Sequence, residues 1–268
     1  MELGKEGYNT DMWYVRKMVG AEILKLRKNK GQVITASLLT VGVVVIYFAV
    51  LEILHLSNST THGPAGGTSN YLNAVSLLIF IGSAAAIIIG ARAGSIDESS
   101  GVFRDLVSSG RGRGSIYAAR IGGAILFYLP FLVVALLLAM FATSIFHGTL
   151  PTPSASGYWN NFAVTIGVDI FNLIMALGIA SLTLSRSITV GVLLVWVLFA
   201  QRLIVSITYL GGVRKAFPLV AEHSLNLSGR GPLNAPITEG TLAAVAVLVI
   251  WSLVSLGVGA MRTIKMDA

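Results

Sequence analysis

Six long apolar runs constrain this chain more than any other feature of its sequence. A helix needs about 20 apolar residues to cross the hydrocarbon core of a bilayer. The runs are 33–56, 71–91, 121–146, 162–185, 188–209 and 241–261. They do not alternate as the strands of a membrane barrel do, and charged residues make up only 12% of the 268 residues, against about 25% in soluble domains. The sequence therefore predicts an all-α integral membrane protein, with six transmembrane helices in a single domain, 1–268.

The positions of Lys and Arg predict the orientation of these helices. Basic residues gather before the first run, between the second and third runs, and after the sixth run, whereas the loops 57–70 and 147–161 contain none. Because basic residues are retained on the cytoplasmic side, both termini are expected in the cytoplasm. The net charge of +7 then reflects contact with anionic headgroups rather than with nucleic acid. The absence of cysteine fits the inner (plasma) membrane of a bacterium.

The segment 11–30 precedes the first run and is amphipathic when it is drawn as a helix. Its apolar residues share one face, and lysines lie on the opposite face. This pattern is typical of a helix that lies in the plane of the membrane interface. The residues expected to contact the interface are Trp13, Arg16 and Lys17. The alternative is a solvated basic tail.

The loop 92–120 lies between the second and third runs and is too polar for the bilayer. Within it, 100–109 can form a short amphipathic helix that Asp97 or a following serine could cap. Its apolar face would hold Val102, Phe103, Leu106 and Val107, and its other side would hold Arg104 and Asp105. Such a helix could fit a groove on a soluble partner. The alternative is a solvated linker whose arginines only fix the topology.

These features resemble the permeases of type-two ATP-binding-cassette (ABC) exporters. In that family the loop carries an acidic residue, two further residues, a glycine, apolar residues and then an arginine before the third span. The matching residues are Glu98, Gly101, Leu106 and Arg113. A run of Gly and Arg stands where the family has a turn that contains proline.

The resemblance implies a partner and a mechanism. Two permeases, identical or homologous, would form the pathway and bind two cytoplasmic ATPases that hold ATP and Mg. The loop would act as a coupling helix, and the interfacial helix would add to the same contact. The coupling residues would be Glu98, Gly101, Val102, Phe103, Arg104, Asp105, Leu106 and Arg113. Residues before the sixth span would form re-entrant helices. From the residues alone, 210–240 is equally well an ordinary surface loop.

Motifs for chemistry are missing from the sequence. There is no G-x-x-x-x-G-K-[ST] phosphate loop, so ATP chemistry must come from another chain. There is also no H-E-x-x-H or G-x-S-x-G motif, and the four histidines are not spaced as zinc ligands. We therefore expect a transport subunit rather than an enzyme, with no metal or cofactor of its own. Its expected partners are the ATPases, a second permease and membrane lipids, with no nucleic acid.

Two charged and two amide side chains lie inside the fourth and fifth runs: Asp169, Asn172, Gln201 and Arg202. At ~1.5 Å of rise per residue from the short turn between these runs, Asp169 and Arg202 fall at nearly the same depth. They could form an ion pair that joins the two spans, or the four residues could line the exit of a substrate path. An alternative function is a secondary carrier or channel without an ATPase, which we would expect to contain more intramembrane ionisable residues.

Overall fold

The computed structural model describes residues 3–99, 101–225 and 235–265, with the side chains of 3–15, 98 and 99 outside the described part. Within these residues all regular structure is helical. Six helices are long and apolar enough to cross a membrane: Lys30–Ser57, Thr68–Asp97, Arg113–Ile145, Ala155–Thr183, Arg186–Ser206 and Thr241–Lys265. Each overlaps one predicted run. The prediction of a multi-pass helical membrane protein is therefore confirmed.

Two of the spans are interrupted by a wider turn. The first span consists of α2 (Lys30–Ser37), the π-helical turn η1 (Leu38–Gly42) and α3 (Val43–Ser57). The fifth consists of α8 (Arg186–Val195), the π-helical turn η2 (Trp196–Ala200) and α9 (Gln201–Ser206). The remaining spans are α4 (Thr68–Ser99), α6 (Arg113–Ile145), α7 (Ala155–Thr183) and α11 (Thr241–Lys265).

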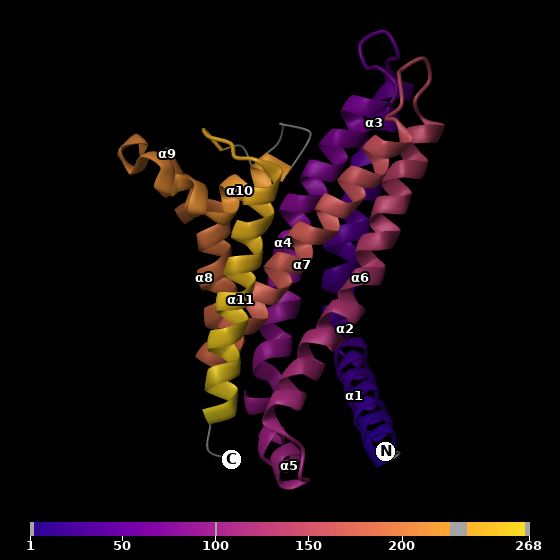
Figure 1. Ribbon diagram of the computed structural model, residues 1–268. Helices are drawn as coiled ribbons and strands as arrows, with labels where there is room; N and C mark the ends of the chain where they lie inside the picture. The colour runs from indigo at the N-terminus through magenta and orange to yellow at the C-terminus, as the bar shows by residue number, and fades with distance from the viewer. Residues whose placement is uncertain (1–2, 100, 226–234, 266–268) are drawn as a thin grey trace.

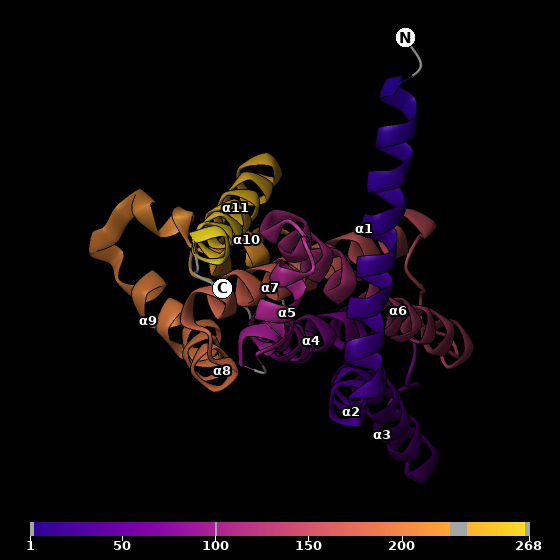
Figure 2. The same cartoon turned by 90° about the horizontal axis from the view of Figure 1, so that it is seen from below.

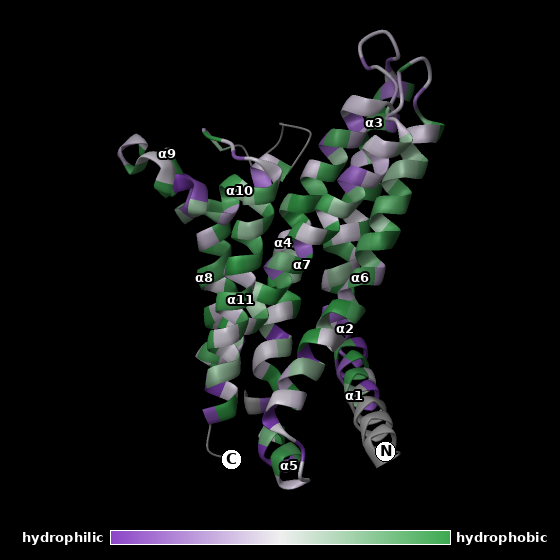
Figure 3. Ribbon diagram, viewed as in Figure 1, coloured by the Kyte–Doolittle hydropathy of each residue, from purple (hydrophilic) through white to green (hydrophobic). Residues whose placement is uncertain are grey.

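The shorter elements lie at the two ends of the bundle. The beginning of α1 (Leu3–Lys28), the short helix α5 (Val102–Ser108) and the end of α11 share one end (Figure 1). The 3₁₀ segment η3 (Thr208–Ala216) and α10 (Pro218–Leu225) lie at the other end. Seen from below, α1 extends sideways from the bundle (Figure 2). Apolar residues cover the spans along most of their length (Figure 3).

The centre of the bundle is the pair α4 and α7, with α3 and α8 on opposite flanks (Figures 1 and 2). Of the six spans, α4 is the most buried, at 72% of its apolar window. Gly90 and Gly94 of α4 lie directly against the backbone carbonyl oxygens of Leu173 and Leu177 of α7. Small residues permit this approach, and close van der Waals packing is a main source of helix association in lipid.

The N-terminal helix begins earlier than the sequence predicts. It runs through Asp11, so it starts well before 11, and it ends at Lys28. Asn29 then caps α2, because its Oδ1 accepts a hydrogen bond of 3.2 Å from the Gln32 amide. Arg16 and Lys17 are exposed as expected for a solvent-facing side. The side chain of Trp13 lies outside the described residues.

Candidate functional site

The first candidate site is the end of the bundle that carries α5. This helix confirms the predicted one within the loop 92–120. It begins after Gly101, whose φ of +75° is a left-handed conformation that suits glycine. Asp97 lies within α4, where its carboxylate contacts two basic residues, and the serine side chains that follow it lie outside the described residues, so the predicted cap by Asp97 or a serine stays a prediction.

Beneath α5, four charged side chains from three helices form what we call the ion cluster: Glu22, Lys25, Asp97 and Arg120. The Arg120 Nε lies 2.9 Å from Asp97 Oδ2, and the Lys25 Nζ lies 2.6 Å from Asp97 Oδ1. The same ammonium group is 2.7 Å from Glu22 Oε1. Asp97 is 1% exposed and Arg120 0%. Because a buried charge is costly unless it is paired, the cluster fixes α1, α4 and α6 to one another.

The neighbours of Glu22, the acid that α1 contributes to the ion cluster, change its pKa. Burial raises the pKa of the Glu22 carboxyl above its ordinary value, and the hydrogen bond from Lys25 opposes this rise. Glu22 also packs its side chain against Gly123 of α6, where no larger residue would fit. The second and third turns of α6 and the last turns of α1 are therefore held by both charge and shape.

Phe103 attaches α5 to this cluster. Its side chain is 3% exposed, and the Arg120 guanidinium carbon lies 5.5 Å from the centre of its ring. A guanidinium group over an aromatic face is an attractive cation–π contact. The sequence grouped Phe103 with Val102 and Leu106 on one docking face, but Phe103 points into the chain. The outer surface of α5 consists instead of Val102, Arg104 and Asp105, which are all exposed.

The other predicted coupling residues lie apart from this contact. Gly101 and Leu106 belong to α5 or its cap, with Leu106 half-buried. Arg113 is at the start of α6, and its Nη1 donates a hydrogen bond of 3.0 Å to the Ile264 carbonyl near the end of α11. It therefore joins the third span to the sixth. The side chain of Glu98 lies outside the described residues.

No family model matches the sequence, and no curated protein matches it. The function proposed below therefore rests on the geometry of the described residues.

The second candidate site is a polar cluster inside the bundle, between α4, α7 and α10. We call it the carboxyl cluster: Ser83, Asp169, Asn172 and Glu222, all at most 3% exposed. The Ser83 hydroxyl donates to Asp169 Oδ1 at 3.2 Å and lies 2.7 Å from the Ile79 carbonyl. The Asn172 Nδ2 donates to Ser83 Oγ at 3.2 Å and to Glu222 Oε1 at 3.0 Å. One amide group thus connects α7 with both α4 and α10.

The predicted ion pair between Asp169 and Arg202 does not form. Asp169 is turned toward Ser83 of α4, whereas the Arg202 guanidinium carbon lies 5.9 Å from the ring centre of Phe80. The tight turn between the two spans sets the depth of each residue. It does not set the rotation of each helix about its own axis, and that rotation separates the two side chains.

Gln201 lies near the carboxyl cluster and binds α10, the short helix that carries Glu222. Its Oε1 accepts a hydrogen bond of 2.9 Å from the Leu219 amide, in the first turn of α10. The structure therefore brings Asp169, Asn172 and Gln201 together around α10 and leaves Arg202 apart.

We expect Gln201→Leu to loosen α10 without disturbing the spans. The change leaves the buried Leu219 N–H without its acceptor, which costs about 1–3 kcal/mol. Accessibility of a cysteine introduced at Ala221 should rise, while the melting temperature of the whole chain changes little. Equal labelling of this cysteine in the two backgrounds would show that the hydrogen bond does not anchor α10. Gln201→Glu, which retains the acceptor oxygen, is the matched variant.

The sequence reasoning missed several members of both clusters. Glu222 was the easiest of these to find from the sequence, because it is a lone acid that ends the apolar stretch 217–222. Tyr128 was not considered either, yet it is fully buried and donates a hydrogen bond of 2.8 Å to the Gly82 carbonyl beside Asp169. Nothing in the spacing of Lys25, Asp97 and Arg120 reveals that they meet.

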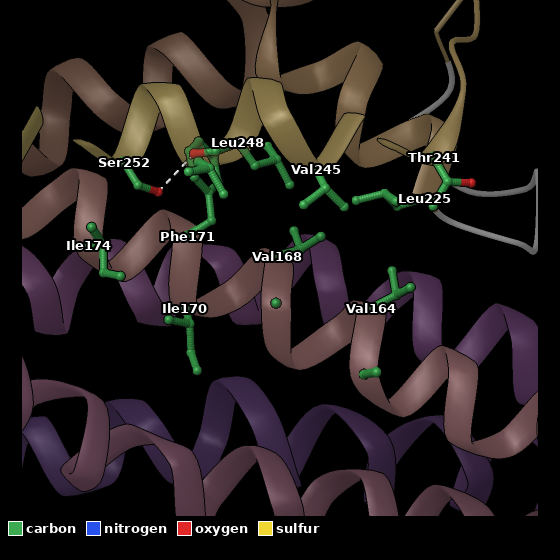
Figure 4. Close-up of a pocket in the computed structure, with 13 residues that line it drawn as sticks. Val164, Val168, Ile170, Phe171, Ile174, Leu225, Thr241, Val245, Leu248 and Ser252 are labelled. Carbon is green, nitrogen blue, oxygen red and sulfur yellow. Dashed lines mark hydrogen bonds between the residues drawn. The ribbon is translucent and has the colours of Figure 1, made fainter. Parts of the chain in front are cut away.

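An apolar groove of ≈ 400 Å³ lies on the other side of α7, between this helix and α11 (Figure 4). Val168, Phe171 and Leu248 belong to its lining. The Ser252 hydroxyl at its edge donates to the Leu248 carbonyl at 2.8 Å, so it is occupied by its own helix. An apolar surface could fit this groove. Its lining has few polar groups that could orient a ligand.

Proposed function

We propose that this chain is the membrane-spanning permease subunit of an ATP-driven exporter of the ABC type. Two copies, or one copy and a homologue, would form the pathway in the inner membrane. Cytoplasmic ATPase subunits would bind ATP and Mg, and their closure would reshape the pathway through α5. Both termini would be cytoplasmic, and η3 and α10 would form the re-entrant element on the outer side.

The contact between Phe103 and Arg120 is the observation that carries this proposal. A force applied to α5 reaches Arg120 directly, and from there it reaches Asp97 and Lys25 through the ion cluster. These residues belong to α6, α4 and α1. A soluble subunit that pushed on α5 would therefore move three elements of the permease together, as a coupling helix requires.

The distribution of charge supports the proposed orientation. Basic residues cluster at the end of the bundle with α5. At the other end, the loops 58–67 and 146–154 contain none, and η3 carries Arg214 and Lys215. Retention of basic residues on the cytoplasmic side would place α5 within reach of an ATPase. A short buried helix such as α10 is compatible with the bilayer, since protein rather than lipid surrounds it.

Purification from native membranes tests this proposal. The chain should co-purify with an ATPase in a fixed ratio. The triple variant Val102→Asp, Arg104→Glu and Asp105→Lys, which changes only exposed residues of α5, should reduce the recovered ATPase by about tenfold or more, equivalent to about 1.4 kcal/mol of binding. Arg186→Glu is the control, because Arg186 is an exposed arginine in the turn between the fourth and fifth spans. A chain that purifies without an ATPase, or a triple variant that retains it, contradicts the proposal.

A secondary carrier is the second candidate, and the carboxyl cluster favours it. Asp169 and Glu222 are two buried acids with no ion pair among the described residues, and such residues mark ion or proton pathways in many transporters. Solute uptake into vesicles that contain only this chain, driven by an imposed ion gradient, would support the carrier and contradict the exporter.

A further inference from the structure

Two buried carboxyl groups in the carboxyl cluster have no basic partner. Asp169 is 0% exposed and Glu222 3%. Among the described residues, every ion pair lies in the ion cluster, so no Lys, Arg or His forms one with either acid. An isolated carboxylate is very costly to bury, and such groups neutralise instead by binding a proton.

Two oxygen atoms of the cluster also lack hydrogen-bond partners. They are Asp169 Oδ2 and Asn172 Oδ1, and both are buried. Asp169 Oδ2 lies against Gly82, so closely that a Cβ at this position would approach it to 2.6 Å. The neighbouring Tyr128 hydroxyl already donates to the Gly82 carbonyl. One proton bound by the cluster would leave a single negative charge where the two acids otherwise bury two.

We propose that Asp169, Asn172 and Glu222 form a proton-binding site that holds α10 on the bundle while the proton is bound. With the proton present, the Asn172 amide donates to Glu222 Oε1 and to Ser83 Oγ, and the Ser83 hydroxyl donates to Asp169, so α7 stays linked to α10. When the proton leaves, both acids carry a negative charge on either side of the Ser83–Asn172 contact, and α10 separates from α7. Because Gln201 still binds the Leu219 amide, the separation begins at Glu222.

The contacts favour a proton over a metal ion. The Asn172 Nδ2 is already in contact with Glu222 Oε1 at 3.0 Å and with Ser83 Oγ at 3.2 Å. A hard cation such as Ca²⁺ or Mg²⁺ bound between these groups would have to displace the amide hydrogens, because such ions are coordinated by oxygen atoms. A proton attaches to an oxygen that is already in place and adds almost no volume.

Glu222 defines the pH range in which the proton should leave. Burial raises the pKa of its carboxyl from 4.5 to about 7, although the Asn172 hydrogen bond opposes the rise. The folded chain therefore keeps a proton that the unfolded chain loses above 4.5. The resulting stabilisation is complete at acid pH and is lost as the pH rises through about 7.

The other titratable groups near α10 provide controls. Tyr128 faces Asp169 from α6, and His223 follows Glu222 on α10 itself. The Glu239 amide donates to Ser224 Oγ at 2.9 Å, and Lys215 is the cation that acts on the Glu239 carboxyl. Burial lowers the pKa of His223 and raises that of Glu239. His223→Gln and Glu239→Gln should therefore leave the proposed behaviour unchanged.

The absence of cysteine from the chain permits a clean test. Ala221→Cys places one thiol at a fully buried position of α10. The full chain is reconstituted in lipid nanodiscs, and its labelling by a water-soluble maleimide is followed between about pH 5 and pH 9, a range that brackets titration of a raised carboxyl. Each rate is divided by the rate of the same reporter in a Glu222→Gln background. This ratio removes the ionisation of the thiol itself.

We expect a ratio near one at acid pH that rises about tenfold or more as Glu222 loses its proton, since tenfold corresponds to one pKa unit of coupling. Asp169→Asn should abolish the rise, and it replaces Glu222→Gln as the reference if that variant does not fold. A ratio that stays flat overturns the proposal. So does a ratio that responds to Na⁺ at constant pH, or one whose rise disappears in His223→Gln or Glu239→Gln. The experiment contains no ATPase, so its result is independent of the exporter proposal.

Discussion

Replacing Arg120 with Met should destabilise the chain by about 3–5 kcal/mol, the loss that is typical when one partner of a buried ion pair is removed. Arg120 is 0% exposed and lies beside an Asp97 carboxylate that is 1% exposed. Met fills a similar volume but carries no charge, so Asp97 loses a buried cation. Phe103 loses its cation–π contact in the same variant, and α5 should detach from α6.

Denaturation of the purified chain in detergent measures the effect. Arg113→Met is the matched control, because Arg113 is a second arginine of α6 whose one hydrogen bond within the described residues reaches the carbonyl of the exposed residue Ile264. Its loss should cost no more than about 1 kcal/mol. The double variant Arg120→Met with Asp97→Leu should recover part of the stability, since neither charge then remains alone. If Arg120→Met were as stable as Arg113→Met, the ion cluster would not hold these helices together.

The second large effect is expected at the contact between α4 and α7. Gly90→Ala places a methyl group against the Leu173 carbonyl oxygen, and Gly94→Ala places one against the Leu177 carbonyl oxygen. Backbone atoms cannot rotate away as a side chain can, so the two helices must move apart. Overpacking of this kind costs about 1–3 kcal/mol at each position, and the double variant should lose more than either single variant.

Gly167→Ala on α7 provides the comparison, because nothing lies within 4 Å of a Cβ built at this position. It should be neutral or slightly stabilising, since Ala is the better helix former by up to about 1 kcal/mol. The melting temperatures of the four variants in detergent distinguish the outcomes. If Gly90→Ala had the same melting temperature as Gly167→Ala, then α4 and α7 would not pack as closely as described.

The composition and the lengths of the apolar runs were sufficient to predict the part of the fold that depends on the membrane alone. The length of an apolar run predicts a span, and the six spans are present. The loop helix at 100–109 was also predictable, because its apolar spacing and flanking glycines act locally. The start of the N-terminal helix was not predictable in this way: the sequence predicts it at 11, whereas the helix begins at Leu3.

The two candidate sites were less predictable because they depend on tertiary structure. Lys25 and Asp97 are 72 residues apart, and their 2.6 Å contact arises only when α1 crosses the end of α4. Asp169 and Arg202 have similar depth, but helix rotation directs them to different neighbours. Glu222 reaches Asn172 because α10 packs into the bundle, and the sequence left 210–240 open between a loop and re-entrant helices.

The π-helical turns η1 and η2 interrupt the α-helical hydrogen bonding of two spans. Each lies near the middle of a span, in the first and fifth spans, on opposite flanks of the α4–α7 pair. A π turn is wider than an α turn, and such turns are frequent at kinks and at functional positions. We therefore expect the α4–α7 pair to stay fixed while shape changes concentrate in the spans on its two flanks.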